Sequence, residues 1–188
     1  MELTCLKIVF NHFIKKDVIV KNPVSRVKFL QENNEIFVVL SESEEKRYLM
    51  ACSQPLQDVA ALIIDCGCRP DEIYQLKKQN VNLDGGYIRI TDGKTKSARR
   101  TIPLSQRALA ILRSRVANAK GEYLFLGGRT PELDKPVVKL NNAHTAAVKR
   151  AKLRNFRLYD CRHTFASRHA MNGTDLVTLK DLLGHSRL

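Results

Sequence analysis

The first forty residues show a helical hydrophobic pattern that ends at a proline. Apolar residues recur between positions 2 and 15 with the spacing of one helix face. This stripe ends before Asn22-Pro23, because the residue that precedes a proline is driven out of the α region. Residues 24–38 mix apolar and polar positions without clear periodicity. The pattern predicts one N-terminal helix followed by a linker.

Three helices are predicted between residues 41 and 77. Ser41 and Glu44 form a capping-box pattern, which favours a helix that runs to about residue 52. Residues 54–66 are mostly apolar, and we interpret them as a largely buried helix. Pro70 is suited to the first turn of a short helix that opens at residue 69 and runs to about residue 77.

The pattern changes to short strands in the middle of the chain. Asp84-Gly85-Gly86 separates the apolar runs 81–83 and 87–90, which is typical of a β-hairpin. Residues 101–104 predict a third strand, reached through a basic loop. Helical spacing then returns in four segments: 105–119, 140–152, 158–171 and 174–183. These elements predict an α+β fold that is mainly helical, with one small antiparallel β-sheet.

The composition fits one globular domain, or one domain and a fragment. The chain has 188 residues, of which 44% are apolar, so it can bury a hydrophobic core. Its longest apolar run, Val59–Ile64, is far shorter than the ~20 residues of a membrane-spanning helix. Lysines interrupt the apolar N-terminus, and no signal-peptide cleavage site follows. We therefore expect a cytoplasmic protein with no membrane partner, whose five cysteines are reduced thiols.

The formal net charge of +13 predicts a polyanionic partner. Positive residues are concentrated in residues 94–100 and in residues 139–170, where Asp160 is the only acidic residue. Aromatic residues make up 6% and tryptophan is absent, which favours a groove that follows phosphates over a platform that stacks bases. A solvated helix face is the alternative explanation for the basic segment 139–170.

Several enzyme classes lack their motifs here. The sequence has no phosphate-binding loop ending in Gly-Lys-Ser/Thr, no dinucleotide-type glycine run and no nucleophile elbow. Cys66 and Cys68 do not have the spacing of a zinc knuckle, and His163 and His169 lack a cysteine or acidic companion at ligand spacing. A metal-dependent nuclease or transposase needs clustered carboxylates, and the aspartates show no such pairing. We expect neither a metal nor a cofactor.

Four cationic side chains lie where the chain is expected to turn. Arg69 opens a helix directly after an apolar segment, and Lys94 lies in the loop between two strands. Arg162 lies beside His163 in an apolar helix, and His185 follows Leu-Leu-Gly. Cations distributed in this way can surround one phosphate, whose equatorial oxygens gain negative charge when a nucleophile attacks. Taken singly, each position is also compatible with a solvated or salt-bridged surface residue.

Four segments resemble the sequence boxes of the tyrosine recombinase (phage integrase) family, and they occur in the family's order. Cys66–Ile73 resembles the first arginine box, usually Thr-Gly-x-Arg-x-x-Glu, and Gly93–Leu104 resembles the β-hairpin lysine segment. Tyr159–Ser167 resembles the second arginine box, and Leu182–Ser186 resembles the Leu-Gly-His-Ser box. The resemblance covers about residues 40–188 and implies the family's catalytic domain. The first helix further resembles the last helix of the family's core-binding domain.

The resemblance implies site-specific DNA recombination and integration without metal or external energy. In this family a tyrosine attacks a DNA phosphate, forms a 3′-phosphotyrosyl bond and frees a 5′-hydroxyl. Arg69 and Arg162 would clamp the non-bridging oxygens. Lys94 would be the general acid, with Lys96 as its rival. His185 would donate to the phosphoryl oxygen or assist proton transfer.

The remaining site residues have supporting roles or bind DNA. Tyr159 stands where the family commonly has histidine; its hydroxyl can donate a hydrogen bond, but a pKa of ~10 makes it a poor base. Glu72 would buttress Arg69 or His185, and His163 would support the second arginine box. The expected contacts with double-stranded DNA are Lys96, Arg99, Arg100, Lys149 and Arg150.

No tyrosine of the chain matches the position of the family's nucleophile. That tyrosine follows the Leu-Gly-His-Ser box by roughly two to three helical turns, and the sequence ends at Leu188. We expect residues 1–30 to be the last core-binding helix plus linker, and residues 31–188 to be a catalytic domain truncated before its nucleophile. Such a chain binds DNA but does not cleave it alone; a non-catalytic DNA-binding regulator or relic on the same scaffold is the alternative. Whole family members act as synaptic homo-tetramers, and whether this chain alone is a monomer stays open.

Overall fold

The computed structural model describes residues 2–28, 37–91, 99–127 and 134–185. The chain divides into two units, Met1–Ile36 and Phe37–Leu188. This division lies six residues beyond the boundary at residue 30 that the sequence suggested.

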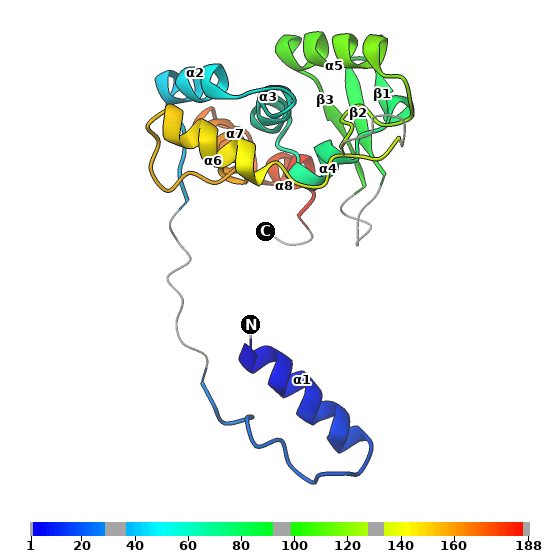
Figure 1. Cartoon of the computed structure of the whole chain (residues 1–188), viewed down its shortest axis with the longest axis vertical. Coiled ribbons are helices and arrows are strands. Elements are labelled where there is room, and N and C mark those ends of the chain that lie inside the picture. The colour runs from blue at the N-terminus through cyan, green and yellow to red at the C-terminus, as the bar shows by residue number, and fades with distance from the viewer. Residues whose placement is uncertain (1, 29–36, 92–98, 128–133, 186–188) are drawn as a thin grey trace. The chain divides into compact units, whose positions relative to one another are not determined.

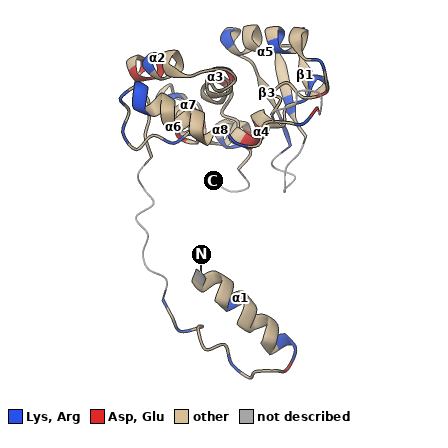
Figure 2. Ribbon diagram, in the orientation of Figure 1, with Lys and Arg blue, Asp and Glu red and all other residues tan. Residues whose placement is uncertain are grey.

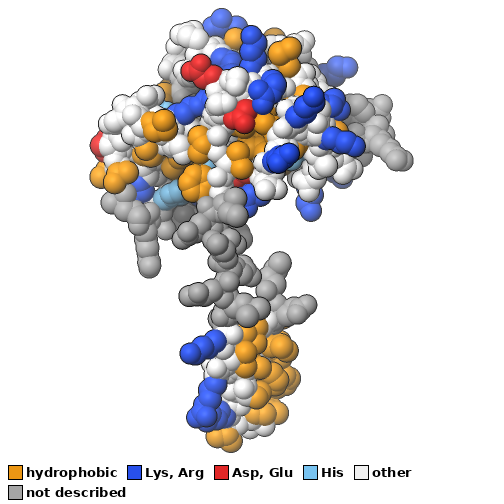
Figure 3. Space-filling view, turned by 90° about the vertical axis from the view of Figure 1, so that its left-hand side faces the viewer, with side chains coloured by type: hydrophobic (Ala, Val, Ile, Leu, Met, Phe, Trp, Pro, Cys, Tyr) orange, Lys and Arg blue, Asp and Glu red, His pale blue; other side chains and the backbone are white. Residues whose placement is uncertain are grey.

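The N-terminal unit is built on α1 (Glu2–Lys15) and the segment that follows it. Asn22 is 7% exposed, and its Nδ2 donates to the Lys7 carbonyl (3.1 Å) and to Oδ1 of Asn11 (2.7 Å). Its own Oδ1 accepts from the Val24 N–H at 3.0 Å. The Asn22-Pro23 pair therefore folds the chain back along α1. Apolar side chains that stay partly exposed form one side of this helix (Figure 3): Leu6, Ile8, Val9 and Phe13.

The C-terminal unit begins with three helices, as the sequence predicted. Helix α2 (Glu42–Ala51) starts with the capping box, in which the Glu44 N–H donates to Ser41 Oγ and the Ser41 N–H donates to the Glu44 carboxylate. Helix α3 (Leu56–Cys66) is buried along almost its whole length, and α4 (Pro70–Tyr74) follows it after a sharp turn. Helix α4 ends earlier than predicted, because the next residues pair with the segment around residue 123: the Lys78 N–H donates to the Glu122 carbonyl, and the Leu124 N–H to the Leu76 carbonyl.

The sheet has three antiparallel strands in the order β1-β2-β3. A single 3-10 turn, η1 (Lys78–Asn80), leads into β1 (Val81–Asn82), which pairs with β2 (Tyr87–Ile90). Strand β3 (Arg100–Pro103) pairs with β2 so that Ile88 lies opposite Ile102 and Ile90 lies opposite Arg100. The inward side of β3 therefore carries Arg100 and Ile102.

The remaining helices pack on α3 or on the elements next to it (Figure 1). Helix α5 (Gln106–Asn118), capped by Ser105, packs on α3 beside the sheet. Helix α6 (Asn141–Arg150) packs on α2, and α7 (Asp160–Met171) packs on α3. Helix α8 (Leu176–Leu183) contacts both α7 and β3. The arrangement confirms the predicted α+β fold, mainly helical with a small antiparallel sheet.

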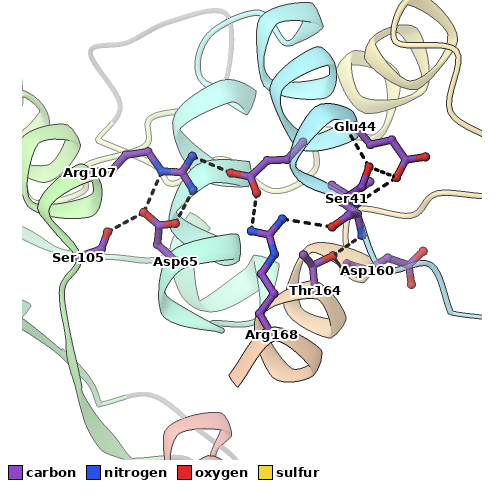
Figure 4. A network of polar contacts seen from close by, with 10 residues as sticks. Ser41, Glu44, Asp65, Ser105, Arg107, Asp160, Thr164 and Arg168 are labelled. Atoms are coloured by element: carbon purple, nitrogen blue, oxygen red, sulfur yellow. Dashed lines mark hydrogen bonds and ion pairs between the residues drawn. The ribbon is translucent and has the colours of Figure 1, made fainter. Parts of the chain in front are cut away.

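A charged network joins these helices around the start of the unit (Figure 4). The Glu45 carboxylate accepts from both Arg107 and Arg168, and Arg107 also binds Asp65. The backbone of Leu40 is held by α7, since its N–H donates to Thr164 Oγ1 and its carbonyl accepts from Arg168, each at 3.1 Å. The network fixes α7 against α2, α3 and α5. Among the described residues, no helix combines the length and apolarity needed to cross a membrane.

Candidate active site

The site is organised around the turn that ends α3. Gly67 has φ +63°, a left-handed conformation that favours glycine. A Cβ at this position would lie 2.4 Å from Cδ1 of Phe165 on α7. The Gly67 carbonyl also accepts a hydrogen bond of 2.7 Å from Nη1 of Arg162. Glycine is therefore required both by the backbone conformation and by the close approach of α7.

Arg69 lies at the N-terminus of α4, two residues after this turn. Its backbone N–H donates to Oε2 of Glu72 at 2.8 Å, and its Nη1 donates to Oε1 at 2.9 Å. The Arg69 side chain remains 35% exposed. Glu72 thus orients Arg69 through both its backbone and its side chain, while the guanidinium still faces solvent.

Arg100 reaches the same carboxylate from β3. Its Nη1 and Nη2 donate to the two oxygens of Glu72 at 2.9 and 2.8 Å, and its side chain is only 6% exposed. Burial raises the pKa of Glu72, but the hydrogen bonds and charge of Arg100, helped by Arg69, outweigh it and hold that pKa below its usual value. We expected Arg100 to contact DNA, and in this structure its guanidinium binds protein acceptors. Its side chain points inward with Ile102, two residues along the strand, because strand residues alternate between faces.

Arg162 is the most deeply buried cation of the site, at 2% exposed. Besides the Gly67 carbonyl, its Nη2 donates to the Leu183 carbonyl (2.6 Å) and to Nε2 of His185 (3.0 Å). Burial lowers the pKa of Arg162, and the nearby charges of Arg69 and Arg100 act in the same direction. A guanidinium stays protonated in proteins even so. Arg162 therefore carries a fixed positive charge that joins the end of α3 to the end of α8.

His185 follows the left-handed turn at Gly184, where α8 ends with φ +69°. Its backbone N–H donates to the Lys180 carbonyl at 3.1 Å. Because Arg162 donates to Nε2, the imidazole is neutral and carries its proton on Nδ1. Burial and then the charges of Arg162 and Arg69 lower the pKa of His185. The structure thus brings Arg69, Arg162 and His185 together from three separate helix ends.

Tyr159 and His163 lie at the start of α7. Their rings meet edge to face with centroids 5.3 Å apart, and Tyr159 is 39% exposed. The ring of Phe37 stacks on the His163 ring, with the two centroids 5.1 Å apart. Burial lowers the pKa of His163, so its imidazole is uncharged near neutral pH. Phe37, Tyr159 and His163 thus form an aromatic cluster at the start of α7.

The expected DNA contacts have different surroundings. Lys94 and Lys96 lie outside the described residues. Arg99 and Lys149 are exposed. Arg150 is exposed too, but its Nε and Nη2 donate to the Ala51 carbonyl at 3.1 and 2.6 Å, which caps the end of α2. Figure 2 shows Lys and Arg over much of the C-terminal unit, with acidic residues grouped on α2.

Sequence reasoning missed Asp160 and Cys68 as parts of the site. Asp160 is fully buried and accepts from the Arg157 N–H at 2.8 Å, so it fixes the turn that leads into α7. Its position as the single acid in a basic segment was the available signal. Cys68 is buried beside Glu72, and burial raises the pKa of its thiol to about 12. A protonated thiol is a poor nucleophile and a poor metal ligand; within the described ranges, no three His, Cys, Asp or Glu side chains are grouped to hold a metal ion.

Comparison with known proteins identifies a family. A model described as the phage integrase family matches residues 16–188. The integrase of Salmonella phage P22 is 27% identical over 84% of this chain and 43% of its own length. The integrase of Escherichia phage P2 is 28% identical over 100% of this chain and 51% of its own length. The chain therefore spans about half the length of these two relatives.

Solved structures agree with this relationship. The catalytic domain of bacteriophage HP1 integrase is 26% identical and aligns with a TM-score of 0.62, over 81% of this chain and 83% of its own. The Tn1549 transposon integrase, solved in complex with a circular intermediate DNA, aligns with a TM-score of 0.79 at 20% identity, over 99% of this chain and 70% of its own. The second likeness shows that the fold is shared.

Proposed function

The chain belongs to the phage integrase family, and we propose that it is the catalytic region of a site-specific recombinase that cleaves and rejoins double-stranded DNA. The observation that carries this proposal is the meeting of Arg162 and His185, 3.0 Å apart, beside the turn that bears Arg69. Two fixed guanidinium groups and an imidazole suit a phosphate that gains negative charge during attack. The reaction proceeds through a 3′-phosphotyrosyl intermediate and releases a 5′-hydroxyl.

In this proposal Arg69 and Arg162 bind the non-bridging oxygens of the scissile phosphate. The Arg162 N–H that donates to Nε2 of His185 in this structure would donate to a phosphate oxygen instead. His185 is then able to carry its proton on Nε2 and to donate a hydrogen bond from this N–H to the phosphate. Loss of one such donor costs roughly 3 kcal/mol in the transition state, by analogy with an oxyanion hole.

The leaving group needs a proton donor, and we assign this role to Lys94, with Lys96 as the competing assignment. Tyr159 takes the slot that is commonly histidine in the family. Its 39% exposed position at the start of α7 suits a hydrogen-bond donor to the phosphate. DNA contacts outside the phosphate site come from exposed cations, of which Arg99 and Lys149 are examples.

In this proposal none of the tyrosines among residues 1–188 is the nucleophile. Tyr48 and Tyr74 are buried, and burial raises the pKa of Tyr74 to about 12 and that of Tyr48 further. Tyr87 lies on β2, and Tyr123 lies in the segment that pairs with Lys77. The family's tyrosine follows the position of His185 by two to three helical turns.

The first test is to sequence the source locus beyond codon 188. If the frame reaches a tyrosine at that spacing, the extended protein is incubated with duplexes from the DNA that flanks its gene, and covalent protein–DNA adducts are counted. We expect adducts that persist in a metal chelator. A stop codon directly after codon 188, or an extended protein that forms no adduct, would refute the catalytic assignment and leave a non-catalytic DNA-binding protein.

The second test separates catalysis from binding. We expect Arg69→Lys and Arg162→Lys to lower adduct formation by about 10²-fold or more, because a lysine cannot bind two oxygens in the same plane. DNA affinity should fall far less. The matched control is Arg154→Gln at an exposed position, which should leave adduct formation unchanged in the bound complex. In a pure DNA-binding protein no adduct would form, and Arg69→Lys and Arg162→Lys would leave the salt dependence of affinity nearly unchanged, because lysine keeps the positive charge.

A further inference from the structure

We propose that Arg100 is a positioning residue of the phosphate site, which holds Arg69 and the turn before His185 in place without contacting DNA. This inference rests on the proposed function. Through Arg100, strand β3 would fix the start of α4 and the end of α8, two helix ends that lie far apart along the chain.

The contacts of Arg100 reach both helix ends at once. Its two terminal nitrogens bind the two oxygens of Glu72 on α4 at 2.9 and 2.8 Å. Its Nε donates to the Leu182 carbonyl on α8 at 2.7 Å. With 6% of its side chain exposed, the guanidinium is committed to protein acceptors, and solvent or a nucleic acid has little access to it.

The first consequence concerns the charge that a phosphate meets. Glu72 shares one negative charge between Arg69 and Arg100, so the three groups together keep a net positive charge. Without Arg100, Glu72 and Arg69 would form a neutral pair, and the carboxylate would compete with the phosphate for the Arg69 guanidinium. Arg100 therefore keeps Arg69 available as an anion-binding group.

The second consequence concerns His185. The last carbonyls of a helix have no partner within the helix. At the end of α8, Arg100 binds the Leu182 carbonyl and Arg162 binds the Leu183 carbonyl at 2.6 Å. Two arginines from different elements thus fix consecutive carbonyls just before the Gly184 turn. This places the His185 imidazole next to Arg162.

Lysine cannot perform this role. Arginine presents several N–H donors in one rigid plane, which allows one side chain to bind both oxygens of Glu72 and the Leu182 carbonyl. A lysine ammonium keeps the charge but offers a single nitrogen on a flexible stem. The pair Arg99 and Arg100 provides a matched control, since Arg99 is the adjacent residue of the same type and is exposed.

The experiment uses the 188-residue chain, with inorganic phosphate as the probe, and follows the His185 ring by NMR. Four variants are compared with the unmodified chain: Arg100→Lys, Arg100→Gln, Arg99→Lys and Arg99→Gln. Loss of a group that orients a ligand-binding residue commonly costs 10–100-fold in affinity at metal sites. We expect both Arg100 variants to weaken phosphate binding about tenfold or more on this scale, and both Arg99 variants to stay within about twofold. If Arg100→Lys, which keeps the positive charge, binds phosphate as weakly as Arg100→Gln, the geometry of the arginine and not its charge alone is required.

Two further readouts identify the kind of role. The pKa of His185 should rise in Arg100→Gln, because a neighbouring positive charge is removed, and should not change in Arg99→Gln. The salt dependence of duplex-DNA binding should be unchanged in Arg100→Gln, whereas loss of a direct phosphate contact in this variant would reduce the slope of log affinity against log salt by about one.

If the Arg100 variants lower only the unfolding midpoint and leave phosphate affinity and the His185 pKa unchanged in the folded protein, Arg100 is merely structural and the inference is wrong. A reduced salt slope would make it a DNA contact instead. If the unmodified chain binds no phosphate, the proposed function fails, and the His185 pKa in Arg100→Gln against Arg99→Gln still decides whether Arg100 acts on that histidine.

Discussion

Replacing Gly67 with alanine should destabilise the C-terminal unit through one identifiable contact. The residue has φ +63°, and an added Cβ would lie 2.4 and 2.6 Å from Cδ1 and Cε1 of Phe165. Contacts below 3.0 Å require movement, and the aromatic ring is itself buried at 4% exposed. The substitution therefore pushes α7 away from the end of α3, at the point where Arg162 binds the Gly67 carbonyl.

The magnitude has two parts. Alanine in the left-handed conformation costs ~1–2 kcal/mol, of which ~0.4–1 kcal/mol is offset by the lower entropy of the unfolded chain. Forcing an extra methyl group against a packed ring adds ~1–3 kcal/mol. We expect Gly67→Ala to lower the free energy of unfolding by about 3 kcal/mol, a large share of the ~5–15 kcal/mol that stabilises a typical domain.

The matched control is Gly86→Ala. Gly86 has φ +66°, but an added Cβ there would meet no atom within 4 Å, so only the backbone cost of about 1 kcal/mol applies. Urea unfolding followed by circular dichroism gives both values, and the difference of about 2 kcal/mol is the cost of the Phe165 contact. Adding Phe165→Leu to Gly67→Ala should recover part of the loss. Equal destabilisation by the two alanine variants would refute the reasoning, because it would mean that α7 yields without cost.

Two further predictions concern buried polar groups. Burial lowers the pKa of His144 below its ordinary 6.5, and this histidine is bound by Tyr48 (2.7 Å) and the Phe156 carbonyl (3.0 Å). The contribution of His144 to stability is therefore full above pH 6.5 and is lost as the pH falls through the lowered pKa of the folded state. We expect the free energy of unfolding of His144→Gln to vary less between pH 7 and pH 5 than that of the unmodified chain. Asp160→Ala removes the acceptor of the Arg157 N–H and should cost about 2 kcal/mol in urea unfolding, whereas Asp160→Asn keeps an acceptor and should cost less; equal losses would contradict this role.

Local signals along the chain placed most helices within a few residues. The capping box at Ser41 acts on the backbone close to itself, so its effect can be read without knowing the fold. Helix α4 was the exception. It ends at Tyr74 because the residues after it hydrogen-bond with residues 122–124, a pairing partner almost fifty residues away that no local pattern announces.

The sequence by itself indicated the family and the fold class, and it singled out Arg69, Arg162 and His185, which we propose as a phosphate site, because such a site requires particular residue types at fixed places in recognisable boxes. Tertiary structure alone decided which cations are committed to protein acceptors. Arg99 and Arg100 are neighbours of the same type, yet one is exposed while the other binds Glu72 and the end of α8. The physical reason is that a charged side chain can be buried only where acceptors from distant segments meet it, and those meetings exist only after the chain has folded.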